Sequence, residues 1–404
     1  MSPRTRKGPG LPRRKDVTPP SDPNAVSSPA DDALSQPLAT ALEAWFRRDH
    51  RDMPWRRTRG PYAIWVSEIM LQQTRVETVE RFYGAFLERF PSVAALAAAD
   101  EQAVLQAWSG LGYYRRARLL HRGAQHVVEQ HGGRLPTDAE GLRSIPGVGE
   151  YTAGAIASIA FDMPVPLVDG NVARVLSRLE AIEDPREQAA TARRHWRRVA
   201  GILRHGTPRV LSQALMELGA TVCTPRSPQC LLCPVRAHCR AQALGKQAEI
   251  PAPRKKVEQP TSQWLALAAT HRGRLLLVRR PAEGLLGDLW CLPLVEAEGN
   301  TAALEREAIT AGFTTPVQWA AAPLPAVRHV FTHRIWDLHP LLGRARKKLE
   351  WRHAPADRQC FVAPGEAPPG GLPRVTEKLL ERLGWQAPRA PEGPRNRTRA
   401  SDPA

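Results

Sequence analysis

The chain has 404 residues, with 57 lysines and arginines against 40 aspartates and glutamates, so its formal net charge is +17. An apolar fraction of 42% is enough for ordinary globular cores, and the length predicts two or three domains. No long uncharged apolar run is present, which argues against a membrane-spanning protein, and the positive excess favours nucleic acid as the partner. A genomic bias towards arginine is the alternative source of part of this charge.

Two terminal segments and one internal segment lack apolar periodicity and divide the chain. Residues 1–37, a basic tail, and residues 387–404 have too few apolar side chains to offset the entropy of ordering, so we expect both to be disordered. Residues 248–262 are proline-rich and charged, as in an extended linker. The predicted order is a first domain over 38–247, this linker, and a second domain over 263–386. No secretory signal is recognised, so we expect a cytoplasmic protein.

The first domain is predicted to be all-α. Strand patterns are absent from it, and eight segments place apolar residues at three- and four-residue spacing. These segments are Leu38–Arg47, Tyr62–Thr74, Val76–Arg89, Ala103–Ser109, Arg115–Gln130, Tyr151–Ala160, Val172–Leu179 and Pro208–Leu218.

One of these helices, Tyr62–Thr74, carries a single carboxylate on an apolar surface. Glu68 shares a face with Trp65 and Leu71, and the opposite face is apolar as well. We therefore expect the helix to be buried and desolvation to raise the pKa of Glu68, as a general acid near neutral pH requires. The alternative is a structural glutamate paired with a nearby arginine.

A glycine-containing turn follows within Leu142–Gly154. Pro146 ends one helix, Gly147 and Gly149 allow a sharp backbone turn, and the next helix begins at once. The amide groups and the dipole at the start of that helix favour a phosphate, so the pattern predicts a helix-hairpin-helix that binds a DNA backbone without reading its sequence. A plain turn between packed helices is the alternative.

An aspartate comes directly before the next predicted helix, in Val165-Pro-Leu-Val-Asp169-Gly-Asn171. As an N-cap, Asp169 should have a lowered pKa, because a helix N-terminus favours the ionised form. An ionised carboxylate that follows an apolar run can stabilise a cation developing in a cleft. The capping role and a catalytic role are therefore compatible.

Four of the six cysteines lie close together, as Cys223-x6-Cys230-x2-Cys233-x5-Cys239. Thiolates at this spacing bind zinc or an iron–sulfur cluster, and the spacing alone does not separate the two. Disulfide bonds are the less favoured alternative, because the rest of the chain is poor in cysteine and no secretory signal is recognised. The same loop carries arginines, which suits contact with a phosphate backbone.

The second domain has a different pattern and is predicted to be α+β. Short candidate strands are Trp264–Ala269, Leu275–Arg279 and Arg328–Leu338. Two candidate helices, Ala302–Ala311 and Val375–Leu383, accompany them.

These motifs together resemble the endonuclease III superfamily of DNA glycosylases. The helix-hairpin-helix, the Val-Asp-Gly-Asn motif and the cysteine loop agree with that superfamily in order and spacing. Within it, Pro54-Trp-Arg, Trp65–Thr74 and Trp108–Tyr114 resemble the MutY adenine glycosylases. The resemblance covers residues 38–247 most strongly, and it implies one [4Fe–4S] cluster held by the four cysteines.

The resemblance also bears on the type of chemistry. Bifunctional members of the superfamily place a lysine in the hairpin segment to attack the sugar, where this chain has Tyr151. Residues 38–245 contain no lysine at all, so activation of water by a carboxylate is the chemistry left. We expect a monofunctional enzyme. A bifunctional lyase and a catalytically silent DNA-binding protein are the rival classes.

Four residues inherit catalytic roles from the resemblance. It implies that Glu68 protonates an adenine flipped out of the duplex and that Asp169 stabilises the cationic sugar as the glycosidic bond breaks. Tyr151 and Asn171 would hold the sugar and the carboxylates in place.

Contacts with DNA are implied as well. Gln73 and Tyr113 would fill the gap in the duplex, and Gly147 and Gly149 would contact phosphate. The expected partner is double-stranded DNA with an 8-oxoguanine:adenine or guanine:adenine mispair. The protein is expected to be a monomer, associated with a bacterial nucleoid and with no membrane.

The second domain resembles the Nudix fold of the MutT pyrophosphatases through Gly287–Pro293 and the helix that follows. A Nudix hydrolase carries adjacent glutamates in that helix to bind divalent metal, and this chain has Thr310 and Ala311 near those places. The resemblance therefore implies recognition rather than hydrolysis. A Nudix pyrophosphatase is the third rival class.

One loop of this domain resembles the Phe-Ser-His loop with which the family reads 8-oxoguanine. It consists of Phe331, Thr332 and His333. Threonine replaces the family's serine, which keeps the hydroxyl and adds a methyl group, so the hydrogen bond is feasible but its geometry changes.

Overall fold

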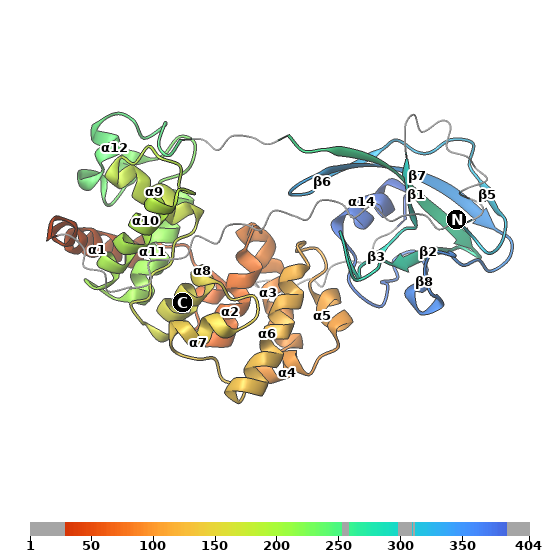
Figure 1. Ribbon diagram of the computed structural model, residues 1–404, viewed down its shortest axis with the longest axis horizontal. Helices are drawn as coiled ribbons and strands as arrows, with labels where there is room; N and C mark the ends of the chain where they lie inside the picture. Colours follow the sequence, from red (N-terminus) through yellow and green to blue (C-terminus); the bar gives the residue numbers. More distant parts are fainter. Residues whose placement is uncertain (1–28, 253–257, 298–308, 310–311, 386–404) are drawn as a thin grey trace, which may run out of the picture. The chain divides into compact units, whose positions relative to one another are not determined.

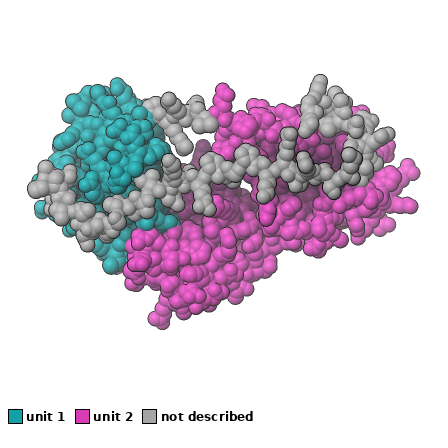
Figure 2. All heavy atoms as spheres, in the orientation of Figure 1, with its two compact units in different colours: residues 1–51, 149–254 teal, residues 52–148, 255–404 magenta. Residues whose placement is uncertain are grey.

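The protein forms two compact units that are each built from two separate stretches of sequence (Figures 1 and 2). We describe it from a computed structural model, in which residues 29–252, 258–297, 309 and 312–385 are placed. Unit 1 comprises Met1–Arg51 and Gly149–Arg254, and unit 2 comprises Asp52–Val148 and Lys255–Ala404. The helices expected as one domain over 38–247 are thus shared between the units.

Unit 1 is a helical body arranged around α11. This helix buries one apolar stripe, with Leu211, Leu215 and Leu218 fully enclosed. The described elements of unit 1 are α1 (Pro29–Asp49), α8 (Glu150–Phe161), α9 (Gly170–Glu180), α10 (Ala189–Leu203), α11 (Pro208–Thr221), η2 (Cys230–Leu232), η3 (Arg236–His238) and α12 (Arg240–Ala243).

The first helix corrects the expected extent of the N-terminal tail. Helix α1 begins at Pro29, so residues 29–37 are helical rather than disordered. Ser35 is buried and accepts a hydrogen bond from Arg198 over 3.1 Å, which anchors this first part of the helix. The disorder expected for residues 1–28 and 387–404 falls outside the described part of the chain.

The first stretch of unit 2 is also helical. Its elements are η1 (Pro54–Arg56), α2 (Pro61–Leu71), α3 (Val76–Arg89), α4 (Val93–Ala97), α5 (Glu101–Ala107), α6 (Arg115–His131) and α7 (Ala139–Ser144). Trp65 and Trp108 are completely buried in it. The helix expected over Tyr62–Thr74 ends at Leu71, and the residues after it form a loop.

The second stretch of unit 2 contains an eight-stranded mixed sheet with the path β3-β2-β1-β7-β5. Strands β1 and β7 run parallel over eleven residue pairs. Alternate residues of β1 enter opposite cores, with Ala266 on the face that also includes α14 residues and Leu267 on the other. The elements are β1 (Thr261–His271), β2 (Arg274–Arg279), β3 (Trp290–Cys291), β4 (Leu294–Ala297), β5 (Val317–Trp319), β6 (Val327–Val330), β7 (Ile335–Ala345), η5 (Ala356–Arg358), β8 (Gln359–Val362) and α14 (Arg374–Arg382).

One predicted strand is wrong, and the difference matters for function. The segment Arg328–Leu338 was expected as a single strand, but it forms the antiparallel hairpin of β6 and β7. The backbone N–H of Phe331 donates to the carbonyl of Arg334 over 2.8 Å, which closes the turn. Residues 331–334 therefore form a loop at the sheet edge. The helix expected over Ala302–Ala311 falls almost wholly outside the described residues.

The fold class expected from the sequence is confirmed, since helices precede a mixed α+β domain. Among the described helices, none combines the length and the apolar character needed to cross a membrane.

Candidate active site and cysteine loop

Asp169 is the N-cap of α9, as the sequence predicts. Its Oδ1 accepts hydrogen bonds from the backbone N–H groups of Asn171 and Val172, over 2.8 and 2.7 Å. Its Oδ2 accepts from the side-chain amide of Asn171 over 3.1 Å. Three donors therefore fix the orientation of one carboxylate at the positive end of a helix.

The pKa of Asp169 is the reverse of what we expected. Burial of the carboxylate raises its pKa above the ordinary value of an aspartate, and the bonds from Val172 and Asn171 lower it by less. The expectation of a lowered pKa weighed the helix terminus and ignored desolvation, which is invisible in a local sequence pattern. Hydrogen-bond donors thus hold the carboxylate in position, although its burial disfavours the ionised form.

Helix α11 packs against Asn171 and Tyr151, two residues of the predicted site. A Cβ on Gly219 would lie 2.6 Å from the Cβ of Asn171, so the close approach of the two helices requires glycine there. One turn earlier on α11, the Sδ of Met216 accepts a hydrogen bond from the hydroxyl of Tyr151 over 3.2 Å. Tyr151 of α8 and Asn171 of α9 therefore both contact α11.

Glu68 lies where the sequence placed it, in the middle of the buried helix α2. Its residue is 5% exposed, and its neighbours Trp65, Ile69 and Met70 are buried as well. Glu68 is not isolated in this apolar helix, because it takes part in at least one polar interaction. The expected raised pKa stays a prediction.

Two loops of unit 2 present exposed side chains from an unusual backbone. We call residues 72–74 and 109–113 the paired loops. Gln73 has a φ of +59° and is exposed, and Tyr113 has a φ of +48° and is 50% exposed. Left-handed backbone is unfavourable for residues with a Cβ, so both positions must be held by their surroundings. Tyr114, in contrast, is buried.

In the predicted hairpin between α7 and α8, Gly147 has the left-handed backbone that a glycine suggests, whereas Gly149 has ordinary extended backbone. Gly147 has a φ of +86°, and a Cβ there would lie 2.6 Å from the Cβ of Leu119. Gly149 is the N-cap of α8. The boundary between the two units falls within this hairpin, after Val148. A helix N-terminus directly after a glycine is suited to contact a phosphate.

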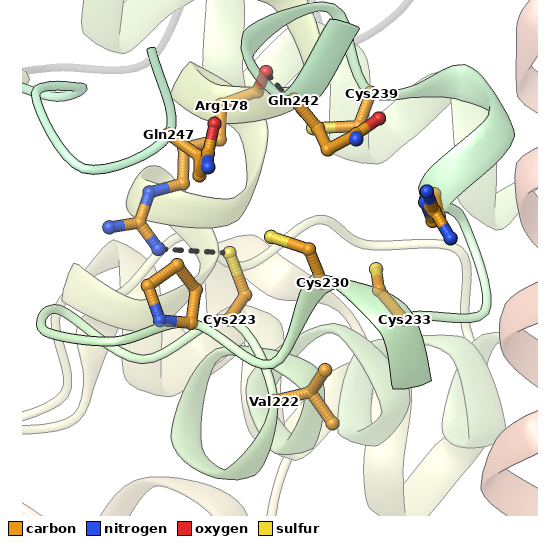
Figure 3. A pocket seen from close by; sticks show the side chains of 10 residues that line it. Arg178, Val222, Cys223, Cys230, Cys233, Cys239, Gln242 and Gln247 are labelled. Carbon is orange, nitrogen blue, oxygen red and sulfur yellow. Dashed lines mark hydrogen bonds between the residues drawn. The ribbon is translucent and has the colours of Figure 1, made fainter. Parts of the chain in front are cut away.

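The four clustered cysteines line one cavity in unit 1, as Figure 3 shows. Arg178 reaches the same cavity and its Nη1 lies 3.4 Å from the Sγ of Cys223. The Sγ of Cys239 donates to the carbonyl of Arg178 over 3.5 Å. Soft sulfur atoms from a single loop and a cation beside them form a donor set suited to an anionic iron–sulfur centre.

Two thiols of this loop, those of Cys233 and Cys239, would not ionise readily on their own. Burial raises the pKa of Cys233 to about 11, and it also raises the pKa of Cys239, with the neighbouring cysteines adding to the shift. A bound metal must therefore displace these protons. No three His, Cys, Asp or Glu side chains in the described ranges converge on a point where one ion could be held.

The loop after β6 presents the three residues singled out in the second domain. Thr332 and His333 are exposed, and the ring of Phe331 packs edge-on against Trp336 with centroids 4.9 Å apart. Gln259 donates its side-chain amide to the carbonyls of Phe331 and Thr332, over 3.2 and 3.0 Å. The loop is thus braced while two polar side chains remain accessible.

Each unit brings together part of the predicted set. Unit 1 holds Asp169, Asn171 and Tyr151 together with the four cysteines, and unit 2 holds Glu68, the paired loops and the loop at residues 331–333. Sequence reasoning missed three arginines that fix these loops, the buried Arg116 and Arg178 and the half-buried Arg174. Helical spacing could have found the first, because Arg116 lies on the stripe of Leu120 and Val127.

Comparison with known proteins agrees with this organisation. Residues 66–200 match the HhH-GPD superfamily of base excision DNA repair proteins, residues 223–239 the iron–sulfur binding domain of endonuclease III, and residues 264–382 the NUDIX domain. The chain is 42% identical over 241 residues to an adenine DNA glycosylase of Mycolicibacterium smegmatis, which covers 59% of this chain and 79% of that protein.

Eukaryotic relatives are similar over a longer stretch. The chain is 37% identical over 355 residues to an adenine DNA glycosylase of Homo sapiens, covering 72% of this chain and 64% of that protein. The corresponding enzyme of Mus musculus is 37% identical over 352 residues, covering 72% and 67%. The chain thus spans just under two thirds of the human relative's length.

Proposed function

The chain belongs to the adenine DNA glycosylase family, and from this we propose that it excises adenine mispaired with 8-oxoguanine or guanine in double-stranded DNA. The observation that carries the proposal is a pair of carboxylates in contrasting settings, Glu68 inside an apolar helix and Asp169 at a helix N-terminus. With no lysine between residues 38 and 245, the enzyme is monofunctional and leaves an abasic site.

The two carboxylates divide the reaction between them. The adenine must leave the base stack, because its glycosidic bond is inaccessible inside a duplex. Glu68 then gives a proton to the base, which makes adenine a better leaving group as the bond to the sugar breaks. Asp169, ionised, stabilises the positive charge that develops on the sugar, and Glu68 accepts a proton from the attacking water. Tyr151 and Asn171 hold the sugar and the carboxylate of Asp169 in place relative to each other.

We propose that the four cysteines hold one [4Fe–4S] cluster. Their side chains line one shared cavity, and residues 223–239 match the iron–sulfur binding domain of endonuclease III, which supports a cluster over a single zinc ion. When bound, the cluster supplies covalent bonds that tie residues 223–239 into one rigid loop. The arginines of this loop would then face a DNA backbone in a fixed arrangement.

The loop Phe331-Thr332-His333 would read the base opposite the adenine. Thr332 and His333 are exposed at a braced turn, and both can exchange hydrogen bonds with the edge of an oxidised guanine. Their support from Gln259 and Trp336 keeps this reading surface in place. Recognition of 8-oxoguanine by this domain is part of the proposal.

Single-turnover cleavage of a labelled duplex tests the reaction directly. With adenine opposite 8-oxoguanine, strand breaks should appear only after hot alkali, because a monofunctional enzyme leaves the backbone intact. Glu68→Gln should reduce the rate by at least about 10³-fold. Its affinity for the mispair should stay within about threefold, since the side chain keeps its size. Breaks without alkali would assign a lyase, and excision by Glu68→Gln at the parent rate would overturn the assignment of the acid.

The matched control is Glu77→Gln, the same substitution at an exposed glutamate in the first turn of α3. It should leave the rate of adenine excision unchanged. If both variants lose activity alike, the loss at Glu68 reflects a change of net charge and not the removal of an acid.

A further inference from the structure

We propose that Arg116 is a positioning residue that holds the exposed side chains of Gln73 and Tyr113 as one pre-organised pair for insertion into the duplex. Arg116 is the second residue of α6, and its side chain runs beneath both paired loops. The inference rests on the proposed function, because it concerns the step in which adenine leaves the base stack.

One end of the guanidinium closes the C-terminus of α2. Nη1 donates to the carbonyls of Ile69 and Met70, over 2.9 and 2.8 Å, and to the carbonyl of Gln72. The last carbonyls of a helix have no partner within the helix, and a cation there also suits the helix dipole. Arg116 thus fixes the point at which α2 ends and the loop of Gln73 begins.

The other end of the guanidinium holds the second loop. Nη2 donates to the Oγ1 of Thr74 over 2.9 Å and to the carbonyls of Leu111 and Gly112, each over 3.2 Å. The Oγ1 of Thr74 in turn donates to the carbonyl of Leu111 over 3.5 Å. The bonds of Arg116 therefore bracket Gln73 on both sides and reach the residue directly before Tyr113.

The guanidinium of Arg116 lies beside two residues whose backbone conformation is strained. Gln73 and Tyr113 both have left-handed backbone, which L residues rarely adopt, and both side chains are exposed. The carbon of the guanidinium lies 5.6 Å from the centre of the Tyr113 ring and 5.4 Å from that of Trp108. A single side chain thus supports the backbone of one insertion residue and both the backbone and the ring of the other.

Arg116 is suited to donate hydrogen bonds to several loop atoms at once, and it makes no ion pair with the described residues. It is 8% exposed, and its acceptors among the described residues are uncharged oxygen atoms, so it acts as a multiple donor. Burial lowers its pKa to about 10, which leaves it charged at neutral pH. Six acceptors around one planar fork cannot be matched by the compact ammonium of lysine.

The consequence for function is that neither insertion residue can move alone. Placing both side chains before DNA binds reduces the entropy lost when they enter the duplex, and small displacements of such groups are costly. Extrusion of the adenine should therefore depend on Arg116, although Arg116 itself is buried beneath the loops.

Extrusion can be measured without the chemical step. The probe is a duplex with 2-aminopurine next to the adenine opposite 8-oxoguanine, bound by the Glu68→Gln protein, and its fluorescence rises when stacking is lost. Adding Arg116→Lys should lower the extrusion equilibrium constant by at least about tenfold. Affinity for an undamaged duplex should stay within about threefold. An unchanged fluorescence rise would overturn the inference.

A double-variant comparison separates positioning from general damage. Gln73→Ala combined with Tyr113→Ala should reduce extrusion by itself, and Arg116→Lys should add less than about twofold on top of it, because no insertion side chain is then left for Arg116 to position. Additive losses would overturn the inference. The matched control is Arg122→Lys, an exposed arginine on the same helix, which should leave extrusion unchanged.

Two further outcomes are informative. If Arg116→Lys unfolds, Thr74→Val replaces it, because this change removes one acceptor of Nη2 and keeps the guanidinium; it should lower extrusion about threefold, and no change would count against the inference. If the parent enzyme neither excises adenine nor raises the fluorescence, the proposed function has failed. If the parent does both and the Arg116 variants match it, only the role of Arg116 has failed.

Discussion

The cysteine loop of unit 1 and the paired loops of unit 2 are held by the same means, a buried guanidinium that donates to backbone carbonyls. In unit 1, Arg178 donates to the carbonyls of Ile250, Thr224 and Pro225, over 2.8, 2.7 and 3.2 Å. In unit 2, Arg116 donates to carbonyls of both loops, those of Gln72 and Gly112. Functional residues often lie on loops, and in each unit a buried arginine holds the loop in place.

The two regions differ in the number of supports. Arg174 adds bonds to the carbonyls of Cys223 and Gly219, over 2.8 and 2.6 Å, and the four thiols offer a further tie through a bound cluster. The paired loops have further hydrogen bonds, such as those from Thr74 to Leu111 and from the Nε1 of Trp108 to the carbonyl of Gly112, but no covalent tie of this kind is offered to them by the described residues. The cysteine loop should therefore tolerate loss of one side chain better than the paired loops do.

The largest expected effect separates capping from catalysis at Asp169. Asp169→Asn should reduce adenine excision by at least about 10³-fold, because the charge that stabilises the cationic sugar is lost. The free energy of unfolding should change by less than about 0.5 kcal/mol, because asparagine caps a helix as well as aspartate does. Single-turnover excision and urea unfolding measure the two quantities.

The control for this prediction is the same change at the N-cap of α7 in unit 2. Asp138 also accepts a hydrogen bond from a backbone N–H in the first turn of its helix, that of Gly141, over 2.8 Å. Asp138→Asn should keep the parent rate. Equal losses at both caps would mean that the loss of a negative charge, and not a catalytic role of Asp169, sets the rate.

The next effect concerns the support of the cysteine loop. Arg178→Met removes the donor to the buried carbonyl of Ile250 and to the partly buried carbonyl of Thr224, so the free energy of unfolding should fall by about 2–4 kcal/mol. Iron bound per chain should fall only slightly, because the cluster itself ties the loop. Urea unfolding and iron analysis test this, with the exposed Arg197→Met as the control. Complete loss of iron would contradict the idea of a second support.

Local patterns made much of this fold predictable. The helical ranges Val76–Arg89 and Pro208–Leu218, for example, agree with α3 and α11 to within three residues, because apolar spacing reports directly on a buried stripe. The cysteine loop followed from three spacings between four cysteines in one short segment. Asp169 was placed as an N-cap from its position before a helix, and the structure confirms it.

Features that depend on distant partners were not predictable. Helix α10 was missed because arginines interrupt its apolar residues, and one of them, Arg198, is buried in an ion pair with Glu180 of α9. The turn that splits Arg328–Leu338 has no glycine or proline to mark it. The burial of Arg116 depends on carbonyls from α2, more than forty residues earlier in the chain.

A smaller effect probes the hydrogen bond between Asn171 and Asp169. Burial already raises the pKa of Asp169, and the bond from Asn171 lowers it. Asn171→Ala removes this stabilisation of the ionised form, so the pKa should rise further and the acid limb of the rate should move to higher pH. The midpoint of that limb, measured by single-turnover rates across pH, is independent of any change in the plateau. A midpoint that stays or falls would contradict the assignment.

The smallest effect tests how much the paired loops depend on their contact with Leu372, which packs in one core of the sheet of unit 2. The hydroxyl of Tyr114, the residue next to Tyr113, donates to the carbonyl of Leu372 over 2.6 Å, and the N–H of Leu372 donates to the Oγ of Ser109 over 3.0 Å. Tyr114→Phe removes the first bond and keeps the ring, so the free energy of unfolding should fall by about 1 kcal/mol.

Excision should change by less than about threefold in Tyr114→Phe, because Arg116 still holds the backbone on either side of Gln73 and before Tyr113. Thermal unfolding and single-turnover excision measure the two effects on one preparation. The opposite pattern, an unchanged stability with a large loss of rate, would show that the sheet positions Tyr113 and that the paired loops are supported as redundantly as the cysteine loop.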